Sequence, residues 1–159
     1  MNINLDFRYP SIKNYLIFDD LKLEVLNKYL GNSSNVISFR NRRFNFFATL
    51  YALFFFFKSE LKVEYICFFL RFTKKKTIIS FNYNRLILYR IKKYYPKVKI
   101  IIIQNGLSND FFIDRLKKSK FKLTCDYFFC ITELEKKIFE KNISSKFIVI
   151  GSFLNNFFF

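Results

Sequence analysis

The sequence contains no histidine, so any acid or base of this chain must be a carboxylate, Lys, Tyr or Cys. For this chain's own residues, that composition excludes the Ser-His-Asp and Cys-His nucleophile systems and histidine-ligated zinc. Three aspartates stand beside predicted strand ends or loops: Asp19, Asp20 and Asp110. Each is a candidate general base, because a positioned carboxylate can remove a proton from a hydroxyl group.

The pair Asp19 and Asp20 also has a purely structural interpretation. It closes segment 15–20, the first predicted strand, and precedes segment 21–30, which predicts a helix because its leucines recur on one helical face. Aspartate is a preferred N-cap residue, and Gly31 is predicted to end the helix. The pattern favours the cap over the base.

Amide, glycine and serine residues follow the other predicted strands. Segment 97–106, KVKIIIIQNG, has the apolar run typical of a strand buried on both faces at the centre of a parallel sheet. In open α/β sheets, ligands bind at the carboxyl ends of the strands. The residues predicted on this basis to bind substrate are Asn82, Asn84, Gln104, Asn105, Gly106, Gly151 and Ser152.

The residue types in this set suggest separate roles. Side-chain amides donate and accept hydrogen bonds, so Gln104 and Asn105 could orient the hydroxyl groups of an acceptor. Gly106 and Gly151 are two of only three glycines, which indicates backbone positions that other residues cannot fill. The alternative for Asn105 and Gly106 is an ordinary strand-to-loop turn with a positive φ at the glycine. The sequence leaves both interpretations open.

The order of predicted elements indicates an α/β fold. Apolar strands alternate with amphipathic helices, which predicts a Rossmann-like doubly wound parallel sheet of about six strands, with helices on both faces, in a single domain. The predicted strands are 15–20, 36–40, 77–82, 97–106, 127–131 and 147–150. The predicted helices after the first are 61–72, 85–95, 111–118 and 132–142. A capping box from Thr132 to Glu135 is predicted to open the last helix.

Segment 46–57, FFATLYALFFFF, is the most membrane-like part of the chain and is flanked by Arg42, Arg43 and Lys58. These twelve residues would rise about 18 Å as a helix, whereas the hydrocarbon core of a bilayer is about 30 Å thick. The segment is therefore too short to span a membrane. Its length favours a buried helix over an interfacial anchor, while its basic flanks keep peripheral contact with an anionic membrane as the alternative.

Composition limits the classes of function further. At 159 residues and 52% hydrophobic content, the chain can form a domain with a real core. The net charge of +16 could attract nucleic acid, but the excess of Lys, Phe, Ile and Asn is also that of an AT-rich coding sequence. Because no motif that reads nucleic acid accompanies the charge, a nucleic-acid partner is not expected. The sequence also lacks a glycine-rich phosphate loop.

Cysteine usage and the first residues bear on location. Cys67, Cys125 and Cys130 are odd in number and lack metal-ligand spacing, which predicts reduced, mostly buried thiols and no metal site. The opening residues, MNINLDFRYPSIKN, lack the apolar region of a secretory signal. These features predict a cytoplasmic protein, with peripheral attachment at the inner membrane as the alternative. No cofactor of the chain's own is expected.

Two segments carry a resemblance to a known family: residues 77–107, TIISFNYNRLILYRIKKYYPKVKIIIIQNGL, and residues 126–156, DYFFCITELEKKIFEKNISSKFIVIGSFLNN. The shared elements are a strand ending in a polar Asn pair, a helix ending at Tyr-Pro, a strand ending in Ile-Gln-Asn-Gly, then Asp-Tyr-Phe-Phe and Val-Ile-Gly-Ser with two asparagines behind it. In this order they resemble the amino-terminal half of bacterial surface-carbohydrate (lipopolysaccharide, O-antigen and capsule) biosynthesis proteins. Those are glycosyltransferase-like proteins of the GT-B type, distantly similar to polyglycerol-phosphate transferases.

The resemblance implies one lobe of a protein with two Rossmann-like domains. It implies a polar arm at 1–13, a GT-B amino-terminal domain at 14–154, and an apolar tail at 155–159 where a carboxy-terminal domain would begin. In such relatives the amino-terminal domain receives a carbohydrate or lipid-linked acceptor, and the other domain binds the nucleotide-activated donor. The expected function is therefore that of an acceptor-side domain, truncated or split and not active alone.

Two other classes of function remain as alternatives. One is a non-catalytic interaction module that pairs with a separately encoded second α/β domain, using its apolar tail as the docking surface. The other is a basic protein that binds nucleic acid or an anionic membrane through charge alone.

Overall fold

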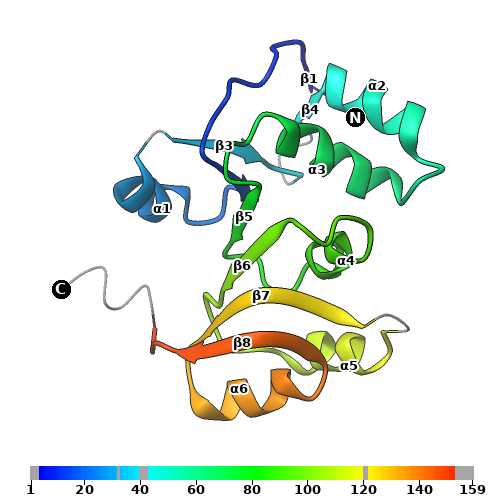
Figure 1. Ribbon diagram of the computed structural model, residues 1–159. Helices are drawn as coiled ribbons and strands as arrows, with labels where there is room; N and C mark the ends of the chain where they lie inside the picture. Colours follow the sequence, from blue (N-terminus) through cyan, green and yellow to red (C-terminus); the bar gives the residue numbers. More distant parts are fainter. Residues whose placement is uncertain (1–3, 32, 40–42, 120–121, 153–159) are drawn as a thin grey trace. The chain divides into compact units, whose positions relative to one another are not determined.

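The computed structural model describes residues 4–31, 33–39, 43–119 and 122–152. It is an α/β protein in which six parallel strands follow the order β3-β2-β5-β6-β7-β8, with helices flanking the sheet (Figure 1). Along the chain, β3 is added on one side of β2, and β5 to β8 are then added in turn on its other side. This single reversal is the doubly wound pattern. The fold class predicted from the alternation of strands and helices is confirmed.

The chain divides into two compact units, residues 1–78 and 79–159. The boundary falls within strand β5 (Thr77–Ser80), whose four residues are all buried. Each unit has its own strands, helices and buried apolar side chains.

The first unit contains two pairs of parallel strands. Strand β1 (Asn4–Asp6) pairs with β4 (Arg43–Asn45), so a strand that the sequence did not predict lies in the predicted polar arm. Strand β2 (Tyr15–Phe18) pairs with β3 (Ser34–Ile37), with Ile17 opposite Val36. Helix α1 (Leu23–Leu30) connects β2 to β3 and ends, as predicted, at Gly31, whose φ is 59°.

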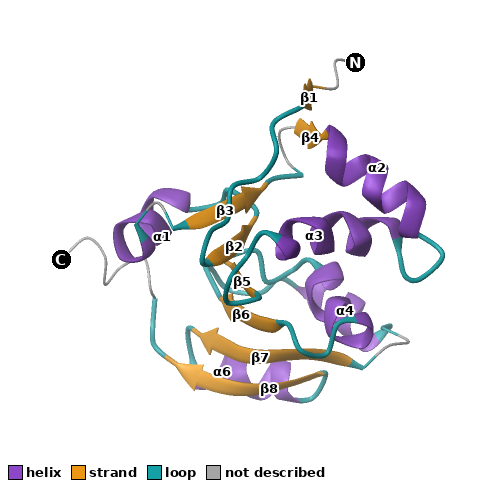
Figure 2. Cartoon of the chain, turned by 45° about the horizontal axis from the view of Figure 1, so that its top comes forward, coloured by secondary structure: helices purple, strands orange, loops and turns teal. Residues whose placement is uncertain are grey.

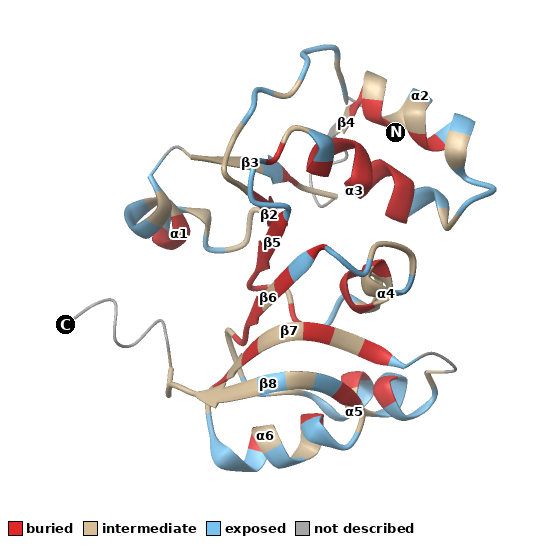
Figure 3. Ribbon diagram, in the orientation of Figure 1, coloured by how far each residue is buried: buried red, intermediate tan, exposed pale blue. Residues whose placement is uncertain are grey.

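Helices α2 (Phe46–Phe55) and α3 (Leu61–Arg71) complete this unit and lie side by side (Figure 2). Residues 63–70 of α3 are all buried, whereas the buried residues of α2, which is described throughout, are Ala48 and Ala52 (Figure 3). The prediction of a helix in segment 46–57 is therefore confirmed, whereas the prediction that this helix is buried is wrong. The packing against α3 covers one face of α2, and large apolar side chains occupy the other face.

The second unit contains three parallel strands: β6 (Lys99–Ile103), β7 (Leu123–Cys130) and β8 (Ile143–Val149). Helix α4 (Leu86–Tyr94) packs against β7, and α6 (Glu133–Glu140) packs against β7 and β8. Helix α5 (Asp110–Lys117) follows β6. Strands β7 and β8 each begin four residues before the predicted start, and their register shifts between Thr124 and Tyr127.

An aromatic cluster forms the core of the second unit beside α6. The Phe139 side chain, which is fully buried, packs on Phe128 of β7 with ring centroids 4.7 Å apart. Tyr83 and Phe112 complete the cluster at centroid distances of 6.1 and 6.2 Å from Phe139. One helix side chain thus connects the sheet to two other segments, so α6 depends on it.

We expect Phe139→Ala to lower the free energy of unfolding by about 3–5 kcal/mol, because it removes buried ring contacts and leaves a cavity. Urea unfolding followed by circular dichroism measures the change. Leu134→Ala on the same helix is the matched control. Its side chain is 70% exposed, so the change should stay within about 0.5 kcal/mol. Equal losses in the two variants would contradict the described packing of α6.

Candidate functional site

The carboxyl ends of β2 and β3 bring polar residues to one edge of the first unit. Because the two strands are parallel neighbours in register, Asp19 and Asp20 after β2 lie beside Ser38 after β3. The backbone pairing continues past the strand end, where the Asp19 N–H donates to the Ile37 carbonyl oxygen at 2.6 Å. In open parallel sheets, this is the edge at which ligands bind.

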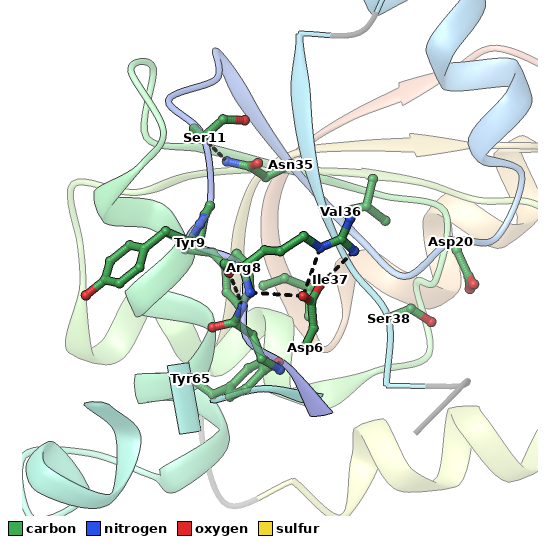
Figure 4. A pocket seen from close by; sticks show the side chains of 13 residues that line it. Asp6, Arg8, Tyr9, Ser11, Asp20, Asn35, Val36, Ile37, Ser38 and Tyr65 are labelled. Atoms are coloured by element: carbon green, nitrogen blue, oxygen red, sulfur yellow. Dashed lines mark hydrogen bonds and ion pairs between the residues drawn. The ribbon is translucent and has the colours of Figure 1, made fainter. Parts of the chain in front are cut away.

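A pocket of about 490 Å³ lies at this edge (Figure 4). Its volume falls within the range of about 300–1,000 Å³ that is typical of small-molecule sites. The polar residues that line it are Asp6, Arg8, Ser11, Asp20, Asn35, Ser38 and Asn45. The aromatic residues that line it are Tyr9, Tyr65 and Phe69.

Asp6 and Arg8 form a two-point ion pair in this lining (Figure 4). Nε of Arg8 donates to Oδ1 of Asp6 at 2.9 Å, and Nη2 of Arg8 donates to Oδ2 at 3.0 Å. The hydrogen bond with Asp6 raises the pKa of the Arg8 guanidinium above its ordinary value. The Arg8 side chain is 88% exposed, and the pair engages two of the five N–H donors of the guanidinium. The pair thus places a carboxylate and a partly engaged guanidinium in the lining.

Asn45 holds three parts of the pocket together. Its Nδ2 donates to the Arg8 carbonyl oxygen at 2.7 Å, and its Oδ1 accepts from the Ala48 N–H at 3.0 Å, which caps helix α2. Its backbone N–H donates to the Tyr65 hydroxyl oxygen on α3 at 2.8 Å. Burial raises the pKa of Tyr65, so this hydroxyl stays neutral. The pocket wall is therefore held by hydrogen bonds that are buried or partly buried.

Asn35 provides the second link between the arm and the sheet. Its Nδ2 donates to the Ser11 carbonyl oxygen at 2.8 Å (Figure 4). Together with the bond from Asn45 to Arg8, this fixes segment 8–11 at two points, one on β3 and one at the start of α2.

The two predicted aspartates at this edge differ in position. Asp19 is 4% exposed, has a φ of 70°, and accepts a hydrogen bond from the Asp20 N–H at its Oδ1, at 2.9 Å. Asp20 is half-buried and lines the pocket. The prediction that this pair caps the following helix is wrong, because the N-cap of α1 is Lys22 and it makes no side-chain capping bond.

The edge of the second unit is formed by residues after β6 and β7. Gln104, which is 1% exposed, accepts from the Ile131 N–H at its Oε1 at 3.0 Å and donates from Nε2 to the Gly106 carbonyl oxygen at 2.9 Å. Both ends of the amide thus connect backbone segments. The geometry gives the Gln104 amide a structural role, and its role in orienting acceptor hydroxyl groups stays a prediction.

Thr132 and Glu135 form half of the predicted capping box. The Thr132 hydroxyl oxygen accepts from the Glu135 N–H at 3.2 Å, as predicted. The Glu135 side chain, however, accepts at Oε1 from the Ser108 N–H at 2.7 Å. Glu135 is 6% exposed and thereby fixes the loop after β6 to the start of α6. This loop contact explains why the glutamate does not complete the box.

Two of the predicted glycines behave differently. Gly151 has a φ of 72°, in the left-handed region, as expected for a position that other residues fill poorly. Gly106 is not among the residues with positive φ, and a Cβ built on it would meet nothing within 4 Å. The turn with a positive φ at Gly106 is therefore wrong, and so is the prediction that other residues cannot fill this position.

The remaining predicted residues lie in the second unit. Asp110 is exposed at the first position of α5, whose N-cap Asn109 accepts from the Phe112 N–H. Asn84 is exposed, whereas Asn82, Asn105 and Ser152 are half-buried. The structure thus brings Asp19 and Asp20 together in the first unit, and the other predicted residues belong to the second.

The buried cysteines do not supply a nucleophile. Cys67, Cys125 and Cys130 are all buried, as predicted. Burial raises the pKa of Cys125 and of Cys130 to about 12. Among the described residues, no cluster of histidine, cysteine or carboxylate side chains could hold a metal ion.

Comparisons with known proteins find no relative: no family model, no curated protein and no solved structure matches this chain. The resemblance to surface-carbohydrate biosynthesis proteins therefore stays a prediction.

Sequence reasoning missed most residues that line the pocket. It identified Asp20, but not the charged pair in the arm or the amides of Asn35 and Asn45. The bond from Asn45 to Arg8 joins residues 37 positions apart, and local patterns carry no signal for such a contact. One available signal was Asn45 directly before an apolar helix, since asparagine is a preferred N-cap.

We expect the thiols of the folded chain to react with iodoacetamide at pH 8 at least about 100-fold more slowly than those of the chain in urea, because only the thiolate attacks. With the folded pKa values of Cys125 and Cys130 raised to about 12, almost no thiolate forms at pH 8. Since unfolded thiols ionise near pH 9, stability should also fall as the pH rises from about 9 towards 12. Mass spectrometry of the labelled chain measures the rates. Fast labelling of the folded protein would disprove the burial of these thiols.

The two glycines provide a second test. Gly151→Ala should lower the free energy of unfolding by about 1–2 kcal/mol, because a Cβ is strained at a φ of 72°. Gly106→Ala should stay within about 0.5 kcal/mol, because its φ is not positive and the site is open. Paired denaturation curves compare the two variants. The reverse order of the two losses would show that the glycine conformations are misassigned.

Proposed function

We propose that the first unit binds a polyhydroxylated acceptor, a sugar or a lipid-linked sugar, in the pocket beside the ends of β2 and β3. In this proposal the chain is the acceptor-side part of a glycosyltransferase-like protein of surface-carbohydrate biosynthesis. The observation that carries the proposal is the lining of the pocket, which combines charged groups, side-chain amides and aromatic rings.

A sugar requires this combination. Each of its hydroxyl groups both donates and accepts hydrogen bonds, so it is matched by a carboxylate, a guanidinium and an amide placed together. The Asp6–Arg8 pair and Asn35 supply these three groups. The C–H faces of a sugar ring are apolar and suit aromatic side chains such as Tyr9 and Tyr65 in the same lining.

The pocket is also prepared before a ligand arrives. Asn45 and Asn35 hold segment 8–11 through side-chain bonds to the backbone at 2.7 and 2.8 Å. A site whose side chains are already fixed loses less conformational entropy when it binds. This favours recognition of a defined ligand over a surface that adapts to many.

Asp20 is the residue that we assign as general base. It lines the pocket, whereas Asp19 is buried and bonded to the Asp20 N–H, and Asp110 belongs to the second unit. The other carboxylate of the lining, Asp6, is paired with Arg8. In transfer, Asp20 would take the proton of the acceptor hydroxyl group. The oxygen of that hydroxyl group would bond to the anomeric carbon of the donor sugar, and the bond from this carbon to the nucleotide diphosphate would break.

The donor side of the reaction belongs to a second α/β domain in this proposal. That domain, in the same or another chain, would bind the nucleotide-activated sugar and stabilise the leaving diphosphate with positive groups. The proposal therefore assigns acceptor binding to the described chain and sugar transfer to the assembled pair of domains.

We expect Asp20→Asn to weaken sugar binding about 10-fold or more, because a hydrogen bond to a charged group contributes about 1.5–3 kcal/mol. The measurement is a titration of the isotope-labelled chain with methyl glycosides of glucose, galactose and N-acetylglucosamine, followed by NMR. Shifts should concentrate on the amides of Arg8, Asn35 and Ser38.

Asp114→Asn is the matched control, because Asp114 is an exposed carboxylate on α5, outside the pocket. This variant should bind as the wild type does. Shifts confined to residues 79–152, equal binding by Asp20→Asn, or no shift with any of the glycosides would each overturn the proposal.

A further inference from the structure

Helix α2 presents an exposed apolar face on the side away from α3. Phe46, Leu50, Leu53, Phe54 and Phe57 fall at positions i, i+4, i+7, i+8 and i+11, which is one face of a helix and its continuation. Their exposed fractions run from 38% for Phe46 to 72% for Phe57. We call these five residues the α2 outer face.

The opposite side of α2 is already used in packing. Ala48 and Ala52 are buried at the i and i+4 positions of that side, and the Tyr51 ring lies 5.6 Å from the Phe68 ring of α3. A helix that is apolar on all sides is normally covered on all sides, by protein or by lipid. In the part of the chain that the structure describes, α3 covers one side of α2.

Neighbouring aromatic residues extend the outer face. Phe7 is 61% exposed and stacks on Phe46 with ring centroids 5.0 Å apart. Phe56 is 56% exposed and packs on Phe57. A contiguous exposed apolar patch of this kind marks an interaction surface.

The charged residues that directly flank α2 in the sequence are basic on both sides. The sequence has no acidic residue between Glu24 and Glu60, while Arg42 and Arg43 precede the helix and Lys58 follows it. Lys58 is exposed, and its Nζ lies 4.7 Å from the centre of the Phe55 ring. An apolar helix with basic residues at both ends is complementary to an anionic lipid surface.

Hydrogen bonding also favours lipid over a protein partner. The outer face consists of phenylalanine and leucine and offers no side-chain donor or acceptor. The Thr49 hydroxyl beside it donates to the Asn45 carbonyl oxygen at 2.9 Å. Protein interfaces carry about one hydrogen bond per 100–200 Å², whereas a bilayer interior requires none.

The helix is the right length to lie in a membrane surface. Its 10 residues rise about 15 Å, half the thickness of the hydrocarbon core. None of the helices among the described residues is long and apolar enough to cross a bilayer.

We propose that α2 is an in-plane membrane anchor that inserts its outer face into the surface of an anionic bilayer. The phenyl and leucyl side chains enter the acyl region, and the exposed Lys58 beside the helix binds lipid headgroups. The proposal is independent of the acceptor pocket, because vesicle binding is measured without any sugar.

The direct test is flotation of the full chain with vesicles. One set is phosphatidylcholine alone, and the other contains about one third phosphatidylglycerol. The wild type should float with the anionic vesicles at physiological salt. The double variant Phe54→Gln and Phe57→Gln should lower the bound fraction at least about 10-fold, because it removes two large apolar side chains without changing charge.

The matched control is the double variant Phe111→Gln and Leu134→Gln, which replaces two side chains of the second unit that are each 70% exposed. It should float as the wild type does. Thermal melts of both double variants establish that they fold, as expected for exposed positions.

Fluorescence supplies a second measurement, because the sequence contains no tryptophan. In Phe57→Trp the single indole should shift to shorter wavelength when anionic vesicles are added, and brominated lipids should quench it. In Phe111→Trp neither effect should occur.

Three results would overturn the proposal. One is a chain that does not float with anionic vesicles. The second is flotation that the Phe54→Gln and Phe57→Gln variant leaves unchanged, which would show adsorption by charge alone. The third is a wild-type chain that forms a homodimer and does not bind vesicles, if the Phe54→Gln and Phe57→Gln variant is monomeric. That result would show that a second copy of the chain covers the α2 outer face.

Discussion

The buried amide of Asn45 is the interaction on which the first unit depends most. The residue is 7% exposed. Its side chain bonds to the arm at Arg8 and to the first turn of α2, and its backbone N–H donates to the Tyr65 hydroxyl oxygen of α3. Buried hydrogen bonds of this kind are costly to break, because the separated groups remain without water. One residue therefore fixes the pocket wall and the start of the apolar helix together.

The two proposals share this structural origin. The acceptor pocket lies against the arm and the ends of β2 and β3, and the α2 outer face begins one residue after Asn45. Since both belong to the first unit, a membrane-bound α2 would hold the pocket near lipid headgroups. That location suits a sugar acceptor attached to a lipid, whose apolar tail stays in the bilayer while its sugar enters the pocket.

The fold could be predicted because its signals are local and repeated. The isoleucine run of β6, the leucines of α1 and the threonine that caps α6 each determine an element from neighbouring residues. The site could be predicted only in part. Strand-end reasoning finds Asp20, but the arm reaches the pocket through β1 pairing with β4 and through amide bonds between segments far apart in the sequence.

Side-chain partners explain why the predicted capping box is incomplete at Glu135, and Gln104 makes the same kind of contact. Gln104 and Glu135 stand where a strand-end rule or a capping rule predicts them, yet each bonds to the backbone of a different loop. Such residues have the types expected of a ligand site because the same hydrogen-bonding groups also hold loops together. Sequence reasoning at a sheet edge therefore identifies polar residues correctly more often than it identifies what they bind.

Helix α2 shows the same limit for apolar residues. A short apolar run is usually core, and composition alone does not tell whether one face or both faces are covered. The decisive feature is the placement of Ala48 and Ala52, which are small, lie on one side and are both buried. Small residues let α3 approach closely on that side, and the large residues then point outward. The arrangement is costly in water unless something covers the outer face, which is why we assign α2 to the membrane surface.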